Sequence, residues 1–377
     1  MVARMAFGPL LRVLHAAWRT RSWPELKLLL KHRLFPRTTI QKDQNPAPPF
    51  LFQMATAYWI SQAIYVAAKL GIADLLQDGP RSSSALAAET RSDAPSLFRV
   101  LRALSSVGVF SQLDKDCFAL SRLGDALRSD VPGSLRAVVI TIGEIHYQAC
   151  GELLHSVRTG SPAFDHVFGT SLFDYLRDNA RAADVFNRGM TNLSSLLAHA
   201  ILLAYDFSGV TSMVDVGGGE GELLIRILEL YPEMTGVVFD VANTVANTLG
   251  SPRRTMGNAE RCSYITGNFF DSVPEGAEVY VLCGVVHDWS DDLAVAILSN
   301  CRKAMTKNGR ALIVEMIVPK TNSASFSKLL DVNMMVMTAG RERTKSEFHA
   351  LLHAADLRVT RIIPTMAPQS VIEAVPK

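Results

Sequence analysis

The stretch that most constrains the fold of this 377-residue chain is 213–222, which reads Met-Val-Asp-Val-Gly-Gly-Gly-Glu-Gly-Glu. An apolar, β-branched run breaks at glycines and passes into a helical pattern over 223–228, as in the first unit of a nucleotide-binding α/β sheet. The next strand pattern ends at Asp240, about 20 residues on, where an acid can hold ribose hydroxyls. The glycine spacing lacks the full dinucleotide fingerprint and no P-loop lysine follows, so we expect a nucleoside ligand without a pyrophosphate. A purely structural glycine turn is the alternative.

Strand and helix patterns alternate from residue 205 to the end, which predicts an α/β domain with a Rossmann-like, doubly wound sheet over residues 205–377. An apolar content of 48% and a charged content of 20% are typical of a globular protein with a substantial core. The predicted strands are 213–216, 236–239, 263–266, 279–286, 311–315, 357–363 and 370–375.

Residues 46–204 form the second predicted domain, which is mostly helical and winged-helix-like. Its helical patterns cover 50–71, 83–90, 94–107, 135–145, 150–157, 172–176, 182–187 and 194–205, with a hairpin pattern over 109–120. A helix, helix, helix, hairpin order also occurs in DNA-binding proteins, but the third helix offers only Arg99 and Arg102 to phosphates and bases. Its many apolar residues favour burial in a dimer interface, and we expect no nucleic acid as a partner.

The N-terminal arm, residues 1–45, is basic: residues 1–42 carry nine Lys/Arg against one acid, Glu25. Two short amphipathic helices predicted there fit an arm packed on a partner subunit, with contact to an anionic membrane surface or an organelle-targeting role as the alternative. Five scattered cysteines without a C-x-x-C pair fit a reducing compartment. No apolar run approaches the roughly 18 residues of a membrane span, so we expect a cytoplasmic enzyme.

Ligands of an open parallel sheet bind beyond the carboxyl ends of the strands. The fourth predicted strand leads into His287 and the fifth ends at Glu315, so these two side chains should lie side by side. A histidine suits proton removal near neutral pH, and a carboxylate on its other ring nitrogen fixes the tautomer. Phe269 and Trp289 offer flat apolar faces to a purine. We expect no metal, because no H-x-x-x-H pattern and no acidic cluster with ligand spacing occurs.

Five stretches carry a family resemblance: Val-Asp-Val-Gly-Gly-Gly at 214–219, Gly-Asn-Phe-Phe at 267–270, Val-His-Asp-Trp-Ser-Asp at 286–291, Asn-Cys-Arg-Lys-Ala at 300–304 and Gly-Arg-Glu-Arg-Thr at 340–344. They resemble the motif series of S-adenosylmethionine-dependent O-methyltransferases. The branch is the dimeric one of plant caffeic-acid and flavonoid enzymes and bacterial polyketide, phenazine and carotenoid enzymes. The resemblance covers roughly residues 50–377 and leaves the arm outside.

The resemblance implies methylation of a hydroxyl group of a small aromatic or polyketide-like metabolite, with S-adenosyl-L-methionine as cofactor, in a homodimer. It implies His287 as general base, bracketed by Glu315 and Glu342. The predicted cofactor-binding residues are Ser194, Asp215, Gly217, Gly219, Asp240, Asn268, Phe269 and Trp289. The predicted substrate pocket contains His146, Met190, Met334 and Met335, with Met337, Phe164, Phe168 and Phe173 as further soft or aromatic side chains that are equally compatible with plain core.

Two positions depart from the family pattern. Asn268 stands where the family usually has Asp, which should weaken cofactor binding without abolishing it. Cys283 stands where Lys is frequent, which puts one polar contact to the cofactor in question. The alternative function is a protein of this fold that binds the cofactor but catalyses a hydroxylation or a pericyclic reaction; the presence of all three catalytic candidates favours methylation.

Overall fold

The computed structural model describes residues 47–242, 244 and 260–377. The chain divides into two compact units, Met1–Thr56 and Ala57–Lys377, each a body of its own. In the first unit the described part contains helix α3 (Ala47–Ala55). The basic arm predicted over residues 1–45 lies outside the described residues.

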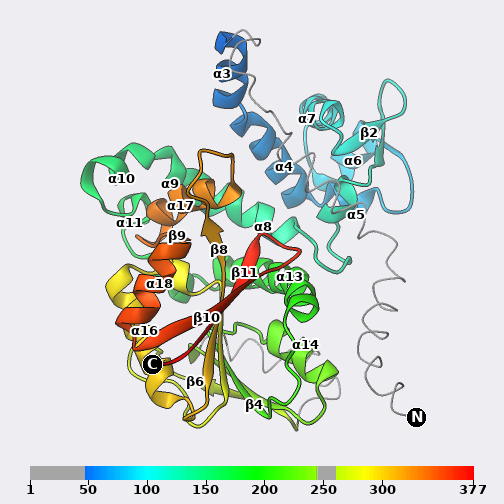
Figure 1. Ribbon diagram of the computed structural model, residues 1–377. Helices are drawn as coiled ribbons and strands as arrows, with labels where there is room; N and C mark the ends of the chain where they lie inside the picture. Colours follow the sequence, from blue (N-terminus) through cyan, green and yellow to red (C-terminus); the bar gives the residue numbers. More distant parts are fainter. Residues whose placement is uncertain (1–46, 243, 245–259) are drawn as a thin grey trace. The chain divides into compact units, whose positions relative to one another are not determined.

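The first part of the second unit is mostly helical (Figure 1). Three short strands form an antiparallel sheet in the order β1-β3-β2, from β1 (Arg81–Ser82), β2 (Phe110–Gln112) and β3 (Cys117–Leu120). The helices are α4 (Tyr58–Leu70), α5 (Ile72–Leu75), α6 (Ser83–Thr90), α7 (Ala94–Ser106), η1 (Gly124–Leu127), α8 (Arg136–Thr141), η2 (Ile142–His146), α9 (Tyr147–Gly151), α10 (Leu153–Thr159), α11 (Ala163–Phe168), α12 (Leu172–Asp178) and α13 (Ala180–Ala204).

Helix α7 begins where its sequence predicts, because the Asp93 carboxylate accepts a hydrogen bond from Ser96 N at 2.9 Å and caps the helix. Its apolar side chains Leu97, Leu101 and Leu104 are at most 3% exposed and pack into the core of this part of the chain with Phe118. The prediction that they form a dimer interface is therefore wrong. Their burial within the chain itself explains the apolar character of this helix.

Two helix boundaries differ from the sequence-based prediction. The helix predicted over 50–71 is divided at the boundary between the two units. The two helices predicted over 182–187 and 194–205 are one continuous helix, α13, with Gly189 inside it. A Cβ atom at Gly189 would lie 3.2 Å from the backbone nitrogen of Val138, so the glycine lets α8 pack closely against α13.

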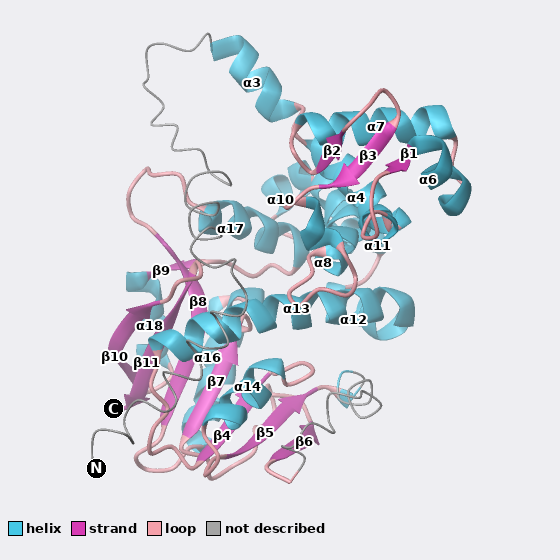
Figure 2. Ribbon diagram, turned by 90° about the vertical axis from the view of Figure 1, so that its right-hand side faces the viewer, coloured by secondary structure: helices cyan, strands magenta, loops and turns pink. Residues whose placement is uncertain are grey.

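The rest of the second unit contains the predicted α/β sheet (Figure 2). The strand order is β10-β11-β8-β7-β4-β5-β6; β8, β7, β4, β5 and β6 are parallel, and β11 is antiparallel to both β8 and β10. The strands are β4 (Ser212–Val216), β5 (Thr235–Asp240), β6 (Cys262–Thr266), β7 (Val279–Cys283), β8 (Arg310–Val318), β9 (Arg343–Thr344), which pairs with β8, β10 (Leu357–Pro364) and β11 (Gln369–Pro376).

Helices cover both faces of this sheet (Figure 1). Buried side chains of α16 (Asp291–Ala304) and α18 (Lys345–Ala354) pack on one face, and those of α13 and α14 (Glu222–Leu230) pack on the other. The doubly wound prediction is confirmed. The remaining helices are η4 (Val286–Asp288) and α17 (Phe326–Met337).

Two strand boundaries near the site differ from the prediction. The fifth strand was expected to end at Glu315, but β8 continues to Val318. The fourth strand was expected to extend to residue 286, but β7 ends at Cys283. Gly284, with a φ of 65°, turns the backbone away, and His287 lies in the short helix η4 that follows. Among the described helices, none has the length and apolar character needed to cross a membrane.

Candidate active site

The glycine turn after β4 is held open by backbone geometry. Gly217 and Gly219 have φ values of 69° and 59°, which residues with a Cβ atom rarely adopt. A Cβ atom at Gly217 would lie 2.8 Å from a methyl carbon of Val285, whereas one at Gly219 would meet nothing within 4 Å. The turn is therefore tightly packed at Gly217. Beside Gly219 the main chain is open, and a ligand can approach it there.

Two carboxylates flank this turn. Asp240 accepts hydrogen bonds from Gly219 N at 2.8 Å and Val241 N at 2.7 Å. Asp215 is 1% exposed, and neither of its carboxylate oxygens makes a hydrogen bond of ordinary geometry within the described residues. Burial and the nearby Asp240 carboxylate raise the pKa of Asp215 to about 7. A buried carboxylate without a hydrogen bond calls for a donor or a cation from a ligand.

The aromatic side chains expected around a purine form a cluster. The Trp289 ring lies 5.8 Å from Phe269 and 4.8 Å from Phe270, both edge-on, and 5.4 Å from Phe173 of α12 in a stacked arrangement. Asn268, in the loop that carries Phe269, accepts from Phe270 N and donates to Asp271. Phe173 is thus part of the wall around Trp289.

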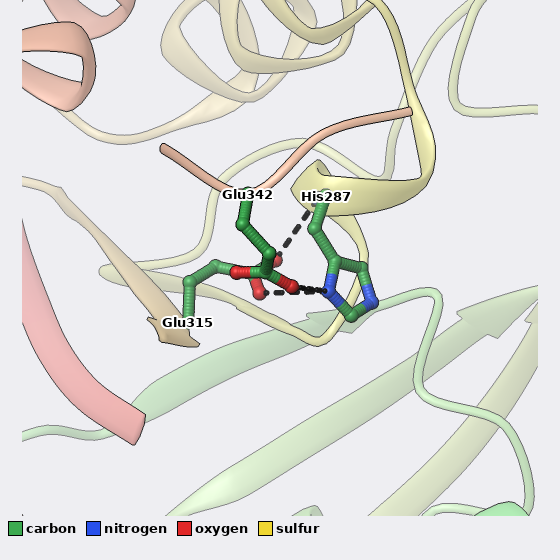
Figure 3. Close-up of side chains that lie close together, drawn as sticks. All are labelled: His287, Glu315 and Glu342. Carbon is green, nitrogen blue, oxygen red and sulfur yellow. Dashed lines mark hydrogen bonds and ion pairs between the residues drawn. The ribbon is translucent and has the colours of Figure 1, made fainter. Parts of the chain in front are cut away.

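The candidate base cluster lies at the carboxyl edge of the sheet (Figure 3). His287 Nδ1 lies 2.7 Å from Glu342 Oε1 and 3.5 Å from Glu315 Oε2, while Glu315 Oε1 accepts from the backbone nitrogens of Val286 and His287. Strand order thus correctly predicts the neighbourhood of His287 and Glu315. Because Nδ1 hydrogen-bonds to Glu342, Nε2 is the nitrogen left to receive a proton (Figure 3).

The electrostatics of this cluster set its proton affinity. Burial lowers the pKa of His287, but the carboxylates of Glu315, Asp288 and Glu342 outweigh burial and raise the pKa to about 10. Burial also raises the pKa of Glu315 to about 7 and that of Asp288 above its ordinary value. The imidazole keeps 19% of its surface exposed, so a small molecule can reach it. The three carboxylates around His287 thus favour the protonated ring at neutral pH.

His287, Glu315 and Glu342 each offer a ligand atom within 4.8 Å of the others, so their geometry could hold a metal ion. The sequence predicts these three residues as a catalytic group but not as a metal site, because they come from distant segments without ligand spacing. Nδ1 is engaged in a hydrogen bond with Glu342 Oε1, and Nε2 remains as the second ring nitrogen that can bind a ligand. The absence of a metal stays a prediction.

The predicted substrate residues lie on three helices. His146 of η2 hydrogen-bonds through Nδ1 to Asn333 Oδ1 of α17 at 3.0 Å. Burial lowers the pKa of His146, although its side chain keeps partial exposure. On α17, Met334 is buried and Met335 is half-buried. Met190, on α13, is also half-buried.

The remaining predicted side chains differ in their burial and contacts. Phe164 is fully buried in a core shared with Met337, so these two side chains are plain core, and the half-buried Phe168 stacks on Phe164 at 4.4 Å. Ser194 is half-buried on α13, and within the described residues no side-chain hydrogen bond joins it to the glycine turn. Its contact with the cofactor stays a prediction.

Three further residues belong to the site and were not singled out from the sequence. Asp288 lies 3.8 Å from His287 Nε2. Asp331 of α17 accepts from Glu342 N at 2.8 Å, and Arg343 contacts the turn around His287. Asp288 and Arg343 lie inside the motifs at 286–291 and 340–344, and this position could have identified them as site residues. Nothing in the sequence distinguishes Asp331. Cys283 is half-buried, and burial together with the nearby carboxylates of Asp215 and Glu315 raises the pKa of its thiol.

Family comparison gives two matches. Residues 150–358 match the family of the O-methyltransferase domain, and residues 52–130 match the O-methyltransferase dimerisation domain. The first match spans the glycine turn, the base cluster and the helices α10 to α13. The second spans the winged-helix-like core around α7.

Individual proteins similar to this chain are methyltransferases as well. The phenazine O-methyltransferase PhzM of Lysobacter antibioticus is 42% identical over 88% of this chain and 97% of its own. The solved structure of CalO1, a methyltransferase in calicheamicin biosynthesis in its S-adenosylhomocysteine-bound form, has a TM-score of 0.76 at 35% identity and covers 89% of this chain and 99% of its own. The phenazine-1-carboxylate N-methyltransferase of Pseudomonas aeruginosa is 34% identical over 83% of this chain and 92% of its own.

Proposed function

This chain belongs to the family of S-adenosylmethionine-dependent O-methyltransferases, and we propose that it methylates a hydroxyl group of a small aromatic or polyketide-like metabolite with His287 as general base. The observation that carries this proposal is the contact of His287 Nδ1 with Glu342 and Glu315, which leaves Nε2 for the acceptor's proton. A non-methylating reaction has no support among the relatives.

The residues of the glycine turn fit the cofactor. The Asp215 carboxylate, which lacks hydrogen bonds of ordinary geometry, would receive the ammonium group of the methionine part. Asp240 would accept from the ribose hydroxyls, and the surface beside Gly219 admits close approach to the main chain. Trp289 and Phe269 would contact the adenine. When bound, the cofactor supplies an electrophilic methyl group on a positively charged sulfonium, which disfavours a second positive charge on the imidazole.

The base is matched to a phenolic acceptor. A phenol has a pKa of about 10 and the carboxylates raise the pKa of His287 to about 10, so proton transfer from a phenol to the neutral ring is nearly balanced. At neutral pH a ring with this pKa is protonated, and the sulfonium charge of the bound cofactor would have to lower the pKa before Nε2 can accept a proton. With an unperturbed imidazole the same transfer would cost about 5 kcal/mol. His287 accepts the proton at Nε2 as the acceptor oxygen attacks, and Glu342 and Glu315 stabilise the imidazolium that forms.

A nitrogen acceptor is the second candidate, because one relative is named as an N-methyltransferase. An amine attacks through a lone pair that it already holds, and needs no base before the methyl group is transferred. A hydroxyl group must lose its proton, and two buried carboxylates behind one imidazole serve that requirement. The base cluster therefore favours oxygen.

We propose that the chain forms a homodimer. The dimerisation-domain match over residues 52–130 supports a homodimer. Contact of the 1–42 arm with a membrane surface has no support, and a cytoplasmic location stays a prediction from the sequence. Sedimentation with anionic liposomes, with and without residues 1–42, tests the arm.

The decisive experiment is incubation with isotopically labelled S-adenosylmethionine and a matched panel of phenols, enols and aromatic amines. We expect label on hydroxyl oxygens of flat aromatic acceptors. Label on amines alone would contradict the oxygen-acceptor proposal. Label on neither class, with cofactor binding intact, would contradict methyl transfer to a small aromatic molecule.

A further inference from the structure

The segment 340–344 carries two arginines in opposite environments. The Arg341 side chain is 46% exposed and pairs with the exposed carboxylates of Asp291 and Glu347. The Arg343 side chain is 1% exposed. Removing a guanidinium from water costs several kcal/mol unless its charge is paired and its donors are used, so a buried arginine at this place requires a reason.

The guanidinium of Arg343 makes four hydrogen bonds and one further ion-pair contact within the chain. Nε and Nη2 each lie 2.8 Å from Oδ1 of Asp291. Nη1 donates to the carbonyl oxygens of Val286 at 2.9 Å and Arg341 at 3.3 Å, and Nη2 donates to that of Trp289 at 2.8 Å. All three guanidinium nitrogens are engaged and the side chain is 1% exposed, so it has no free face for an anionic ligand. Arg343 therefore acts on the protein itself.

The carbonyl groups that Arg343 binds flank the candidate base. Val286 precedes His287, and Trp289 follows it by two residues. The same segment contacts the turn a second time, because Arg341 N donates to His287 O at 2.8 Å. Glu342, whose carboxylate binds His287 Nδ1, lies between the two arginines. The relative position of imidazole and carboxylate is thus set by this one crossing of two backbone segments.

We infer that Arg343 is a positioning residue for the reaction proposed above, which this inference presupposes: its guanidinium holds the turn that carries His287 against the segment that carries Glu342. A lysine at this position keeps the charge but cannot reach both carbonyl oxygens and Asp291, because one ammonium group replaces a planar fork of five donors. A displacement of about 1 Å between reacting groups lowers turnover by about 100-fold. Because Arg343 also binds the carbonyl oxygen of Trp289, it fixes the backbone that carries the Trp289 ring of the aromatic cluster.

The test compares Arg343→Lys with Arg341→Lys, the same change two residues away on an exposed side chain. For Arg343→Lys we expect a folded protein, S-adenosylhomocysteine affinity within about threefold of the parent, and kcat lowered about 100-fold at little changed KM. The acid limb of kcat should move to lower pH, because His287 loses part of its carboxylate contact. Arg341→Lys should leave kcat and the pH profile unchanged.

Several results would overturn the inference. One is a folded Arg343→Lys protein whose kcat and pH profile equal those of Arg341→Lys. If Arg343→Lys does not fold, Arg343→Gln takes its place with the same measurements, and unfolding of both assigns Arg343 to stability alone. NMR titration of His287 in the S-adenosylhomocysteine complex needs no acceptor. An unchanged His287 pKa there overturns positioning, whereas a parent enzyme that methylates no acceptor overturns the proposed function instead.

Discussion

A single methyl group at Gly340 should disable the site without unfolding the protein. Gly340 faces the backbone of the turn that carries the base: a Cβ atom there would overlap His287 O and lie 2.5 Å from Asp288 C and 2.8 Å from Asp288 Cα. These are main-chain atoms, which cannot rotate out of the way as a side chain can. Gly340→Ala must therefore move the turn or the segment 340–343.

The size of the effect follows from these distances. Carbon atoms in contact lie about 3.5 Å apart, so the 2.5 Å separation from Asp288 C requires a shift of about 1 Å. Overpacking of this kind costs about 1–3 kcal/mol, less than the roughly 5–15 kcal/mol that stabilises a folded domain. A shift of about 1 Å at the reacting groups lowers turnover by about 100-fold. Activity should be lost well before stability.

The assay is the initial rate of methyl transfer to the best acceptor of the panel, with thermal unfolding and S-adenosylhomocysteine binding measured in parallel. Gly151→Ala is the matched control, because a Cβ atom at this residue of α9 meets nothing within 4 Å. We expect the control to keep full activity. A folded Gly340→Ala enzyme as active as Gly151→Ala would refute the packing argument at the crossing of the two segments.

Three further predictions concern charge. His287→Gln should lower turnover by about 100-fold or more with cofactor affinity retained, and His349→Gln, an exposed histidine of α18, should not; equal turnover in both would mean that His287 is not the base. Glu342→Gln should move the acid limb of kcat to lower pH, since carboxylates raise the pKa of His287 to about 10; an unmoved limb in a pH-rate profile would contradict this electrostatic coupling. Although burial opposes it, hydrogen bonds from Arg361, Thr360 and Tyr205 lower the pKa of Glu373 to about 2. This stabilisation is present above the unfolded value of about 4.3 and is lost as pH falls toward about 2, so Glu373→Gln should destabilise at pH 7 and have little effect near pH 2 in urea unfolding.

The part of the site that the sequence predicts is the part that strand order determines. His287 follows β7, and Glu315 lies in the neighbouring parallel strand β8, so strand order brings them together without any family knowledge. Glu342 follows α17 in a segment whose path no periodicity specifies, and only the motif resemblance identified it. The fourth strand was predicted too long because Val285 and Val286 continue its apolar run, although Gly284 ends it.

The residues that the sequence does not predict act through tertiary contacts. Asp331 and Arg343 contact backbone groups, and any residue can supply a backbone group, so no pattern of residue types reveals them. The apolar residues of α7 were assigned to a dimer interface because periodicity shows that a helix face is buried but not against what. Likewise Phe164 and Phe168 cannot be separated from a substrate pocket by composition alone.

Helix α17 has a consequence for engineering the acceptor range. Its Asp331 is hydrogen-bonded to Glu342 N, while Val336 and Met337 of the same helix are buried against α9, α11 and α12. Repacking this helix to admit a bulkier molecule would be transmitted to the Glu342 carboxylate, which the proposed function places beside the base, and gains in scope there would be offset by slower turnover. Libraries directed at half-buried positions such as Met190 on α13 avoid that trade-off, and make the better first target.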